Sequence, residues 1–298
     1  MKTSTITALW GSVAVALVAG QASAGTLNPA NVPAKAQVVG HVDLDALRSS
    51  KLALTFAKEI LDSKREIDSQ LKSQGVPLSA DDILGASSIT FWAEGDDAEK
   101  GAMIISGVDA AKFKRAIKKV PVHKSLGNGL HKVDDTFVGF TGSRMVVADD
   151  KSSVKATLKV LDGGGKSLAQ TKKAKRLTQS GGVLVLAAFE EAIAKKIKKE
   201  ADSAIFKNVS LKRGTMTLKE SGGNLVARAV LETTDTAGAD QLHKLAAGGI
   251  SFLSVASDSP ELGKLLDAVT IKTSGTSVVF QASLPINQLK DIAKALDK

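Results

Sequence analysis

No cysteine occurs in the 298-residue sequence, and this absence restricts how the chain can be stabilised. Disulfides, thiolate zinc sites, iron–sulfur clusters and cysteine nucleophiles are all excluded. With 43% hydrophobic and 24% charged residues, the composition is that of a folded globular protein. The length allows one large domain or two of ordinary size. A hydrophobic core alone must therefore hold the fold together.

The first 24 residues have the pattern of a secretory signal peptide. Lys2 supplies the positive charge, residues 8–20 are mostly apolar, and Ala22-Ser23-Ala24 matches the A-x-A cleavage pattern. We therefore expect cleavage near Ala24 and a mature protein that is secreted, periplasmic or extracellular. No later stretch is long and apolar enough to predict a transmembrane anchor in the mature chain.

Strand and helix patterns recur in the same order in two halves of the mature chain. The first half predicts a strand at 36–42, a helix at 44–71, a hairpin at 88–106, a helix at 110–119, short strands over 130–148 and a helix at 152–161. The second half predicts a strand at 183–189, a helix at 190–204, a hairpin at 209–232, a helix at 237–247, a hairpin at 269–283 and a helix at 286–296. These patterns predict an α+β fold with two similar halves, each a mainly antiparallel sheet packed against helices on one face.

The strongest break in the pattern is Asp162-Gly163-Gly164-Gly165. It predicts a signal peptide at 1–24, a first α+β repeat at 25–161, a basic Gly-rich linker at 162–182 and a second repeat at 183–298. The phrases VVGHVDLDAL (38–47) and VLVLAAFEEA (183–192) correspond in pattern. The layout resembles secreted bacterial proteins of unknown function built from duplicated α+β units. This resemblance covers the mature chain and implies no active-site residues.

Positive charge is concentrated in residues 166–213, which hold 12 Lys+Arg and four Asp+Glu. Such a concentration attracts polyanions or acidic surfaces. The candidate anion-binding residues are Lys172, Lys173, Lys175, Arg176, Lys195, Lys196, Lys198 and Lys199. The alternative interpretation is a solvated linker followed by a solvated helix face.

Two short motifs that are typical of enzymes are incomplete. Gly165-Lys166-Ser167 lacks the earlier glycine of a phosphate-binding loop, because Val160 occupies that position. Ser152 and Lys155 fit the S-x-x-K pattern, but the companion motifs of penicillin-recognising enzymes are missing. Ser152 is better explained as the N-cap of the following helix.

His41, Asp43 and Asp45 are weak candidates for a metal site. Alternation along a strand would place all three on one face, and a hard cation accepts carboxylate oxygens. The competing interpretation is that Asp43 or Asp45 caps the helix that begins near Ala46. We expect no catalytic residues, no metal and no cofactor.

The sequence favours a secreted, non-enzymatic envelope protein that acts by binding. The expected partner is an anionic envelope polymer or an acidic protein, bound through residues 166–213. Nucleic acid is not expected as a partner, because the protein is predicted to be exported from the cytoplasm. In addition, few aromatic residues lie among the basic ones, where they could stack on bases. Two alternatives stay open: an envelope hydrolase whose site converges only in three dimensions, and a carrier of an apolar ligand held between sheet and helices.

Overall fold

The computed structural model describes residues 27–73, 77–95, 97–177, 182–190, 209–256 and 259–296. The first half contains η1 (Pro29–Asn31), β1 (Val38–Asp43), α2 (Leu44–Arg48), α3 (Lys51–Thr55), α4 (Ala57–Ser73), α5 (Ala80–Leu84), β2 (Ser88–Glu94), β3 (Asp97–Ser106), α6 (Ala110–Lys118), β4 (His123–Ser125), β5 (Leu130–Val133), β6 (Thr136–Thr141), β7 (Arg144–Ala148) and α7 (Lys151–Leu161). After it come η2 (Leu168–Gln170), η3 (Lys172–Arg176), β8 (Leu184–Phe189), β9 (Leu211–Ser221), β10 (Asn224–Thr233), α9 (Thr236–Ala256), α10 (Pro260–Asp267), β11 (Val269–Ser274), β12 (Ser277–Pro285), η5 (Ile286–Gln288) and α11 (Leu289–Leu296). The predicted helix at 190–204 falls almost wholly outside the described residues, as does the predicted signal peptide.

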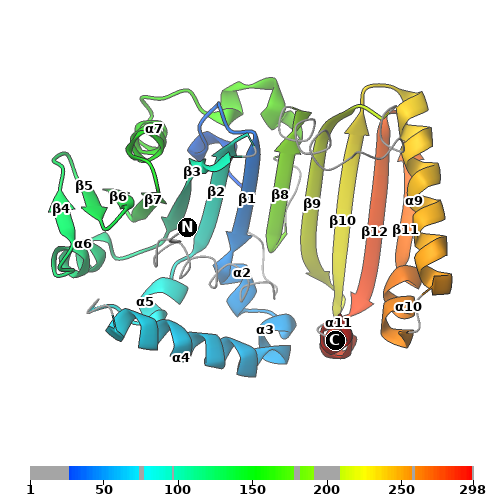
Figure 1. Ribbon diagram of the computed structural model, residues 1–298, viewed down its shortest axis with the longest axis horizontal. Helices are drawn as coiled ribbons and strands as arrows, with labels where there is room; N and C mark the ends of the chain where they lie inside the picture. The colour runs from blue at the N-terminus through cyan, green and yellow to red at the C-terminus, as the bar shows by residue number, and fades with distance from the viewer. Residues whose placement is uncertain are drawn as a thin grey trace.

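The described strands form one antiparallel sheet in the order β11-β12-β10-β9-β8-β1-β2-β3-β7-β6-β5-β4 (Figure 1). β1 pairs with β2 on one side and with β8 on the other, so the two halves share one sheet. The α+β class and the antiparallel sheet are therefore confirmed. Outward from the centre, the order β1-β2-β3-β7-β6 in the first half parallels β8-β9-β10-β12-β11 in the second.

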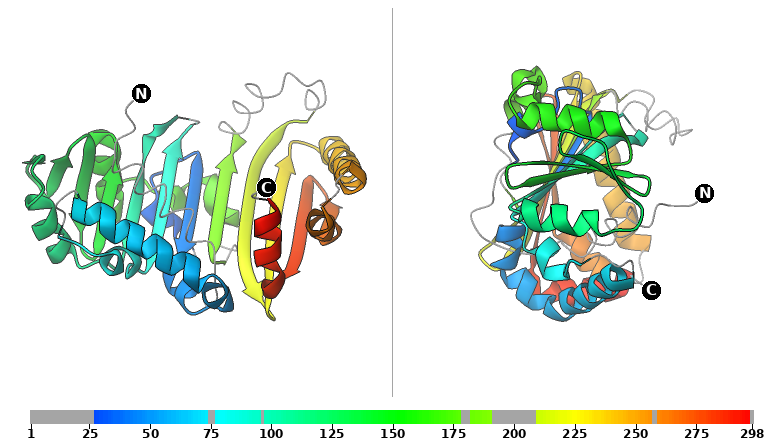
Figure 2. Two further views of the ribbon diagram at one scale, coloured as in Figure 1. Left: turned by 60° about the horizontal axis from the view of Figure 1, so that its bottom comes forward. Right: turned by 90° about the vertical axis from the view of Figure 1, so that its left-hand side faces the viewer.

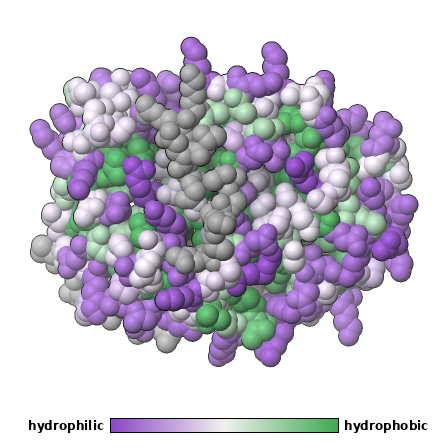
Figure 3. Space-filling view, turned by 180° about the vertical axis from the view of Figure 1, so that it is seen from behind, coloured by the Kyte–Doolittle hydropathy of each residue, from purple (hydrophilic) through white to green (hydrophobic). Residues whose placement is uncertain are grey.

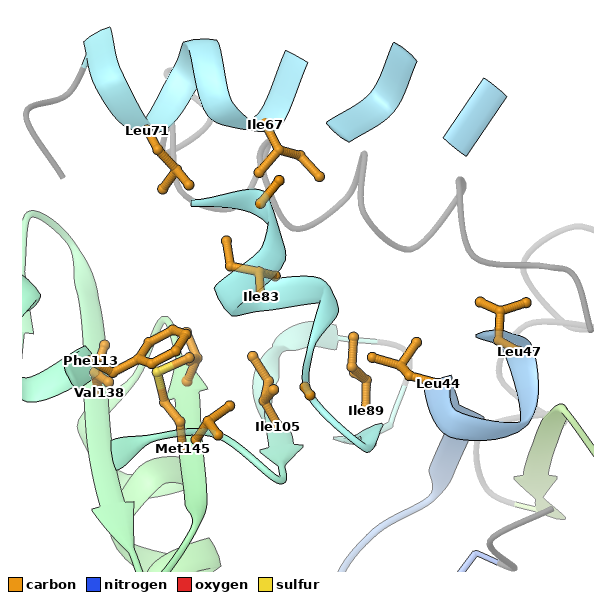
Figure 4. Close-up of a cluster of buried hydrophobic side chains, with 14 of the residues drawn as sticks. Leu44, Leu47, Ile67, Leu71, Ile83, Ile89, Ile105, Phe113, Val138 and Met145 are labelled. Carbon is orange, nitrogen blue, oxygen red and sulfur yellow. The ribbon is translucent and has the colours of Figure 1, made fainter. Parts of the chain in front are cut away.

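Helices cover both faces of the sheet in the first half, whereas the sequence predicted helices on one face only. Ile89, Ile105 and Met145 point to the face covered by α2 to α6, where their side chains join a large apolar cluster (Figure 4). Trp92 and Val146 point to the opposite face, which α7 and the short helices η1, η2 and η3 cover. In the second half, α9 packs on one face around Ala239 and Leu242.

The helix predicted as one element at 44–71 is three helices, α2, α3 and α4. Ser50 interrupts the helical path because its hydroxyl accepts a hydrogen bond from the Ala53 amide and donates one to the Leu47 carbonyl, at 3.0 and 2.7 Å. Serine at an N-cap stabilises a new helix start in this way. Apolar side chains from α2, α3 and α4 nevertheless enter one cluster, which explains why periodicity alone suggested a single helix.

The connection predicted at 162–182 is integrated into the core over most of its described length. Leu168 and Leu177 are fully buried, and Ala174 is 5% exposed. The Leu168 amide donates to the Val32 carbonyl at 2.7 Å, and the Ala34 amide donates to the Lys166 carbonyl at 3.0 Å. The segment therefore forms a layer with η1 and α7 on one face of the sheet.

A glycine on β6, Gly139, allows α7 to pack closely against the sheet. A Cβ atom at Gly139 would lie 2.6 Å from Leu158 Cδ1 and 2.9 Å from Val154 Cγ1, both on α7. A buried hydrogen bond of 3.0 Å from Trp92 Nε1 to Thr157 Oγ1 also joins the sheet to this helix. The position of α7 thus depends on the missing side chain at residue 139.

We predict that Gly139→Val destabilises the protein by about 1–3 kcal/mol, because the added carbons overpack the contact with α7. Urea unfolding monitored by circular dichroism measures the change. Gly249→Ala is the matched control, since its Cβ would meet no atom within 4 Å and it lies in the exposed part of α9. That change should add roughly 0.5–1 kcal/mol of stability. A Gly139→Val protein as stable as the wild type would contradict the close packing of α7 against Gly139.

Candidate anion-binding surface

The structure places only part of the predicted basic segment. Lys172, Lys173, Lys175 and Arg176 lie in η3, where the Lys172 side chain is exposed. The Lys173 ammonium lies 5.3 Å from the centroid of the Phe189 ring, a cation–π contact with β8. The other four candidates, Lys195, Lys196, Lys198 and Lys199, lie outside the described residues.

A row of three lysines on α7 extends this basic surface. Lys151, Lys155 and Lys159 are all exposed and four residues apart, so they lie along one side of the helix at intervals of about 6 Å. The opposite side of α7 is buried through Val154, among others. None of the ion pairs between described residues involves these three lysines. Their charges are therefore directed at solvent.

A second basic helix lies across the sheet from α7. Arg115, Lys118 and Lys119 are exposed in or directly after α6. The view from the end of the sheet shows the two helices on opposite sides of the strands (Figure 2, right). No acidic residue occurs anywhere between Asp109 and Asp134 in the sequence. Folding thus places two acid-poor helices around the same group of strands.

We define residues 110–177 as the basic region; it comprises α6, β4 to β7, α7, η2 and η3. It contains 16 Lys+Arg and five Asp+Glu, a net charge of +11. From behind, hydrophilic residues cover much of the right-hand side of the molecule, where the end with α6 and α7 then lies (Figure 3). Among the described residues, the surplus of positive charge therefore extends toward the N-terminus beyond residues 166–213.

The few carboxylates of the basic region are mostly engaged in local structure. Asp150 is the N-cap of α7, where its Oδ1 accepts the Ser153 amide at 2.8 Å. Asp162 accepts a hydrogen bond of 2.6 Å from the Thr141 hydroxyl, and Asp135 lies 3.4 Å from the Lys132 ammonium. These acids neutralise neither the α7 row nor the exposed side of α6.

The S-x-x-K candidate has a structural explanation, although the predicted cap was wrong. Asp150, and not Ser152, caps α7, and the Ser152 hydroxyl donates to Asp150 Oδ1 at 2.5 Å. Burial tends to raise the pKa of Asp150, but the hydrogen bonds from Ser152 and Ser153 outweigh it and lower that pKa. The serine thus supports the helix start.

We predict that Asp150→Ala destabilises the protein by about 1 kcal/mol at neutral pH through loss of the N-cap. Because the folded-state pKa lies below the unfolded value, the ionised carboxylate stabilises the protein above about pH 4 and loses this effect as the pH falls. Asp150→Asn, which keeps a capping oxygen, should therefore approach wild-type stability in acid. Urea unfolding at pH 7 and pH 3 measures both; a pH-independent difference between wild type and Asp150→Asn contradicts the assignment.

The three metal candidates each have a different partner. His41 Nδ1 lies 2.8 Å from the Thr90 hydroxyl, and Asp43 caps α2 by accepting the Ala46 amide at 2.8 Å. Asp45 forms an ion pair with Arg48. Within the described part of the chain, no three His, Asp or Glu side chains are grouped to hold a metal ion. The capping interpretation of Asp43 is confirmed.

A histidine pair lies within the basic region and was not anticipated from the sequence. His123 Nε2 on β4 and His131 Nδ1 on β5 are 2.9 Å apart, so one ring donates a hydrogen bond to the other. His131 is 5% exposed and meets Phe140 edge-on, with 6.1 Å between ring centroids. Burial, then His123, Lys118 and Lys114, lower the pKa of His131. The two histidines are eight residues apart and meet only because β4 and β5 pair.

Comparison with known proteins finds similarity in structure alone. No protein-family model and no curated protein sequence matches the chain. Among solved structures, crystal form I of TP0453 matches with a TM-score of 0.49 and 11% identity, covering 91% of this chain and 98% of that one. Crystal form III of TP0453 matches with a TM-score of 0.49 and 10% identity, covering 91% and 99%. Within the described residues, every helix is too short or too polar to span a membrane.

Proposed function

We propose that this protein binds an anionic polymer of the bacterial envelope through its basic region. The observation that carries the proposal is the exposed row of Lys151, Lys155 and Lys159 on α7, which forms no ion pair with a described acid. The exposed cations of α6 and the exposed Lys172 of η3 extend the positive surface to both faces of the sheet. Nearby positive charges raise the local potential, which increases the capture rate of an anionic partner.

The distribution of these cations fits a polymer better than a small anion. The α7 row extends about 12 Å along the helix axis, and α6 presents its cations on the other side of the strands. A small anion can contact only one or two of these groups at once. A flexible polyanion can contact many, with each contact releasing counterions, so its affinity falls steeply with salt.

We predict that Lys151→Glu/Lys155→Glu/Lys159→Glu weakens retention of the protein on heparin-agarose. The triple variant should elute at a clearly lower NaCl concentration, because it replaces three solvent-directed cations by anions. For binding to dextran sulfate, the slope of log affinity against log salt should become shallower by about 2–3.

The matched control is Lys51→Glu/Lys58→Glu/Lys72→Glu. These three lysines are exposed on α3 and α4, outside the basic region, so the change in net charge is the same. The control should elute close to the wild type. Equal losses in both triple variants would show that net charge alone governs retention, and would reject the basic region as the binding surface.

We propose that the protein is exported and processed after Ala24. The support is the signal-peptide pattern of residues 1–24. Expression in a bacterial host followed by osmotic-shock fractionation and N-terminal sequencing should recover a periplasmic chain that begins at Gly25. A cytoplasmic chain that retains residues 1–24 contradicts export.

We also propose that the two halves descend from one duplicated α+β unit. The support is the shared strand order outward from β1 and β8, together with a hairpin, helix, hairpin, helix succession in each half. Superposition of β1-β2-β3-β7-β6 on β8-β9-β10-β12-β11 tests the proposal. Halves that do not superpose over these strands would rule the duplication out.

A further inference from the structure

The histidine pair lies beside the cations of α6 in the basic region. Lys114 and Lys118 of α6 are the charged groups that act on His131 from that helix, and neither takes part in an ion pair between described residues. The Lys114 ammonium lies 5.3 Å from the centroid of the Phe140 ring, which itself contacts His131. His131 is therefore surrounded by positive charge and an apolar ring.

The remaining neighbouring elements contribute further lysines, an apolar face and the exposed Asp134, which follows Val133, the strand partner of His123. β4 contributes His123 and the exposed Lys124, and β5 contributes Lys132, whose partner is Asp135. β6 contributes Val138, opposite His131 in the strand register, and Phe140. The lysines of α6 therefore oppose an added proton on His131.

The contact between the rings accepts one additional proton without breaking. In the neutral pair, one N–H donates to the lone pair of the other nitrogen across 2.9 Å. Protonation of the donor ring leaves that bond in place and makes it charge-assisted. Protonation of both rings would place two N–H groups and two like charges against each other. The surrounding positive charge disfavours the uptake of this single proton, and an anion that offsets the charge favours it.

We propose that polyanion binding to the basic region is linked to proton uptake by the His123–His131 pair, so that affinity rises as the pH falls. The inference rests on the proposed function. A bound polyanion offsets the field of Lys114, Lys118 and Lys124 and so favours the protonated pair. Since linkage is reciprocal, the protonated pair binds the polyanion more tightly.

Isothermal titration calorimetry with dextran sulfate tests the linkage, because sulfate esters stay ionised over the pH range used. Affinity should rise on the order of three- to tenfold between pH 7.5 and pH 5.5, and one linked proton allows at most about tenfold per pH unit. Titrations at pH 6 in two buffers of different ionisation enthalpy should show net uptake of a fraction of a proton up to one proton.

The decisive variant is His123→Gln/His131→Asn, which keeps amide donors and acceptors near the two ring nitrogens but does not titrate in this range. Its affinity should change little between pH 7.5 and pH 5.5, and its proton uptake on binding should be largely lost. His243→Gln, in α9, is the matched control and should behave like the wild type. If the double variant does not fold, an NMR titration of wild-type His131 replaces it, and the pKa of that ring should rise when dextran sulfate is present.

The possible failures are distinguishable. Absence of binding at pH 7.5 and at pH 5.5 contradicts the proposed function itself. Binding at pH 7.5 that neither strengthens at pH 5.5 nor takes up protons leaves the proposed function standing and overturns the linkage. A double variant that keeps the full pH dependence, or a His131 pKa unmoved by the polymer, also overturns it, because the proton then binds elsewhere.

Discussion

The antiparallel pairing of β1 with β8 is the contact on which the rest of the structure depends. β1 occurs early in the chain and β8 more than 140 residues later, yet they pair from Val38 opposite Ala188 to Val42 opposite Leu184. This pairing turns two groups of strands into one sheet. On one face of this sheet, Leu168 and Leu177 join Val154 of α7 in one apolar cluster.

The sheet topology determines which charged segments lie near one another in the folded molecule. The segment 166–177 is a continuation of the α7 layer, anchored by Leu168 and Leu177. α6 is brought to the opposite face of the same strands by the pairing of β4 to β7. A basic region with a net charge of +11 therefore forms in a mature protein whose predicted net charge is only +8. Acidic residues concentrated elsewhere, as among 43–109, account for the difference.

Local sequence signals predicted much of the fold. The hairpins predicted at 209–232 and 269–283 are β9–β10 and β11–β12, and the cap at Asp43 was confirmed. The predictions that were wrong or missing concern helix caps, where neighbouring polar residues compete for one position, and strands that pair across a long stretch of sequence. Ser50 divides a helix that periodicity suggested was continuous, and Asp150 replaces Ser152 as the cap of α7. The continuous sheet was not predicted, because the β1–β8 register involves side chains whose pattern also fits two separate sheets.

The candidate anion-binding surface was also only partly predictable from the sequence. The four-residue spacing of Lys151, Lys155 and Lys159 is visible in the sequence, but only packing of Val154 and Leu158 against Gly139 decides that this row faces solvent. The contact of His123 with His131 requires the β4–β5 register, which residue types do not specify.

The protonation chemistry of this histidine pair follows from its place beside the lysines of α6. The lysines beside His131 favour its neutral form, and on the proposed linkage a bound polyanion would offset their charge and favour the protonated form. A binding surface made only of lysines has nearly constant charge between pH 5 and pH 8, whereas one that includes this pair responds to acidity in that interval.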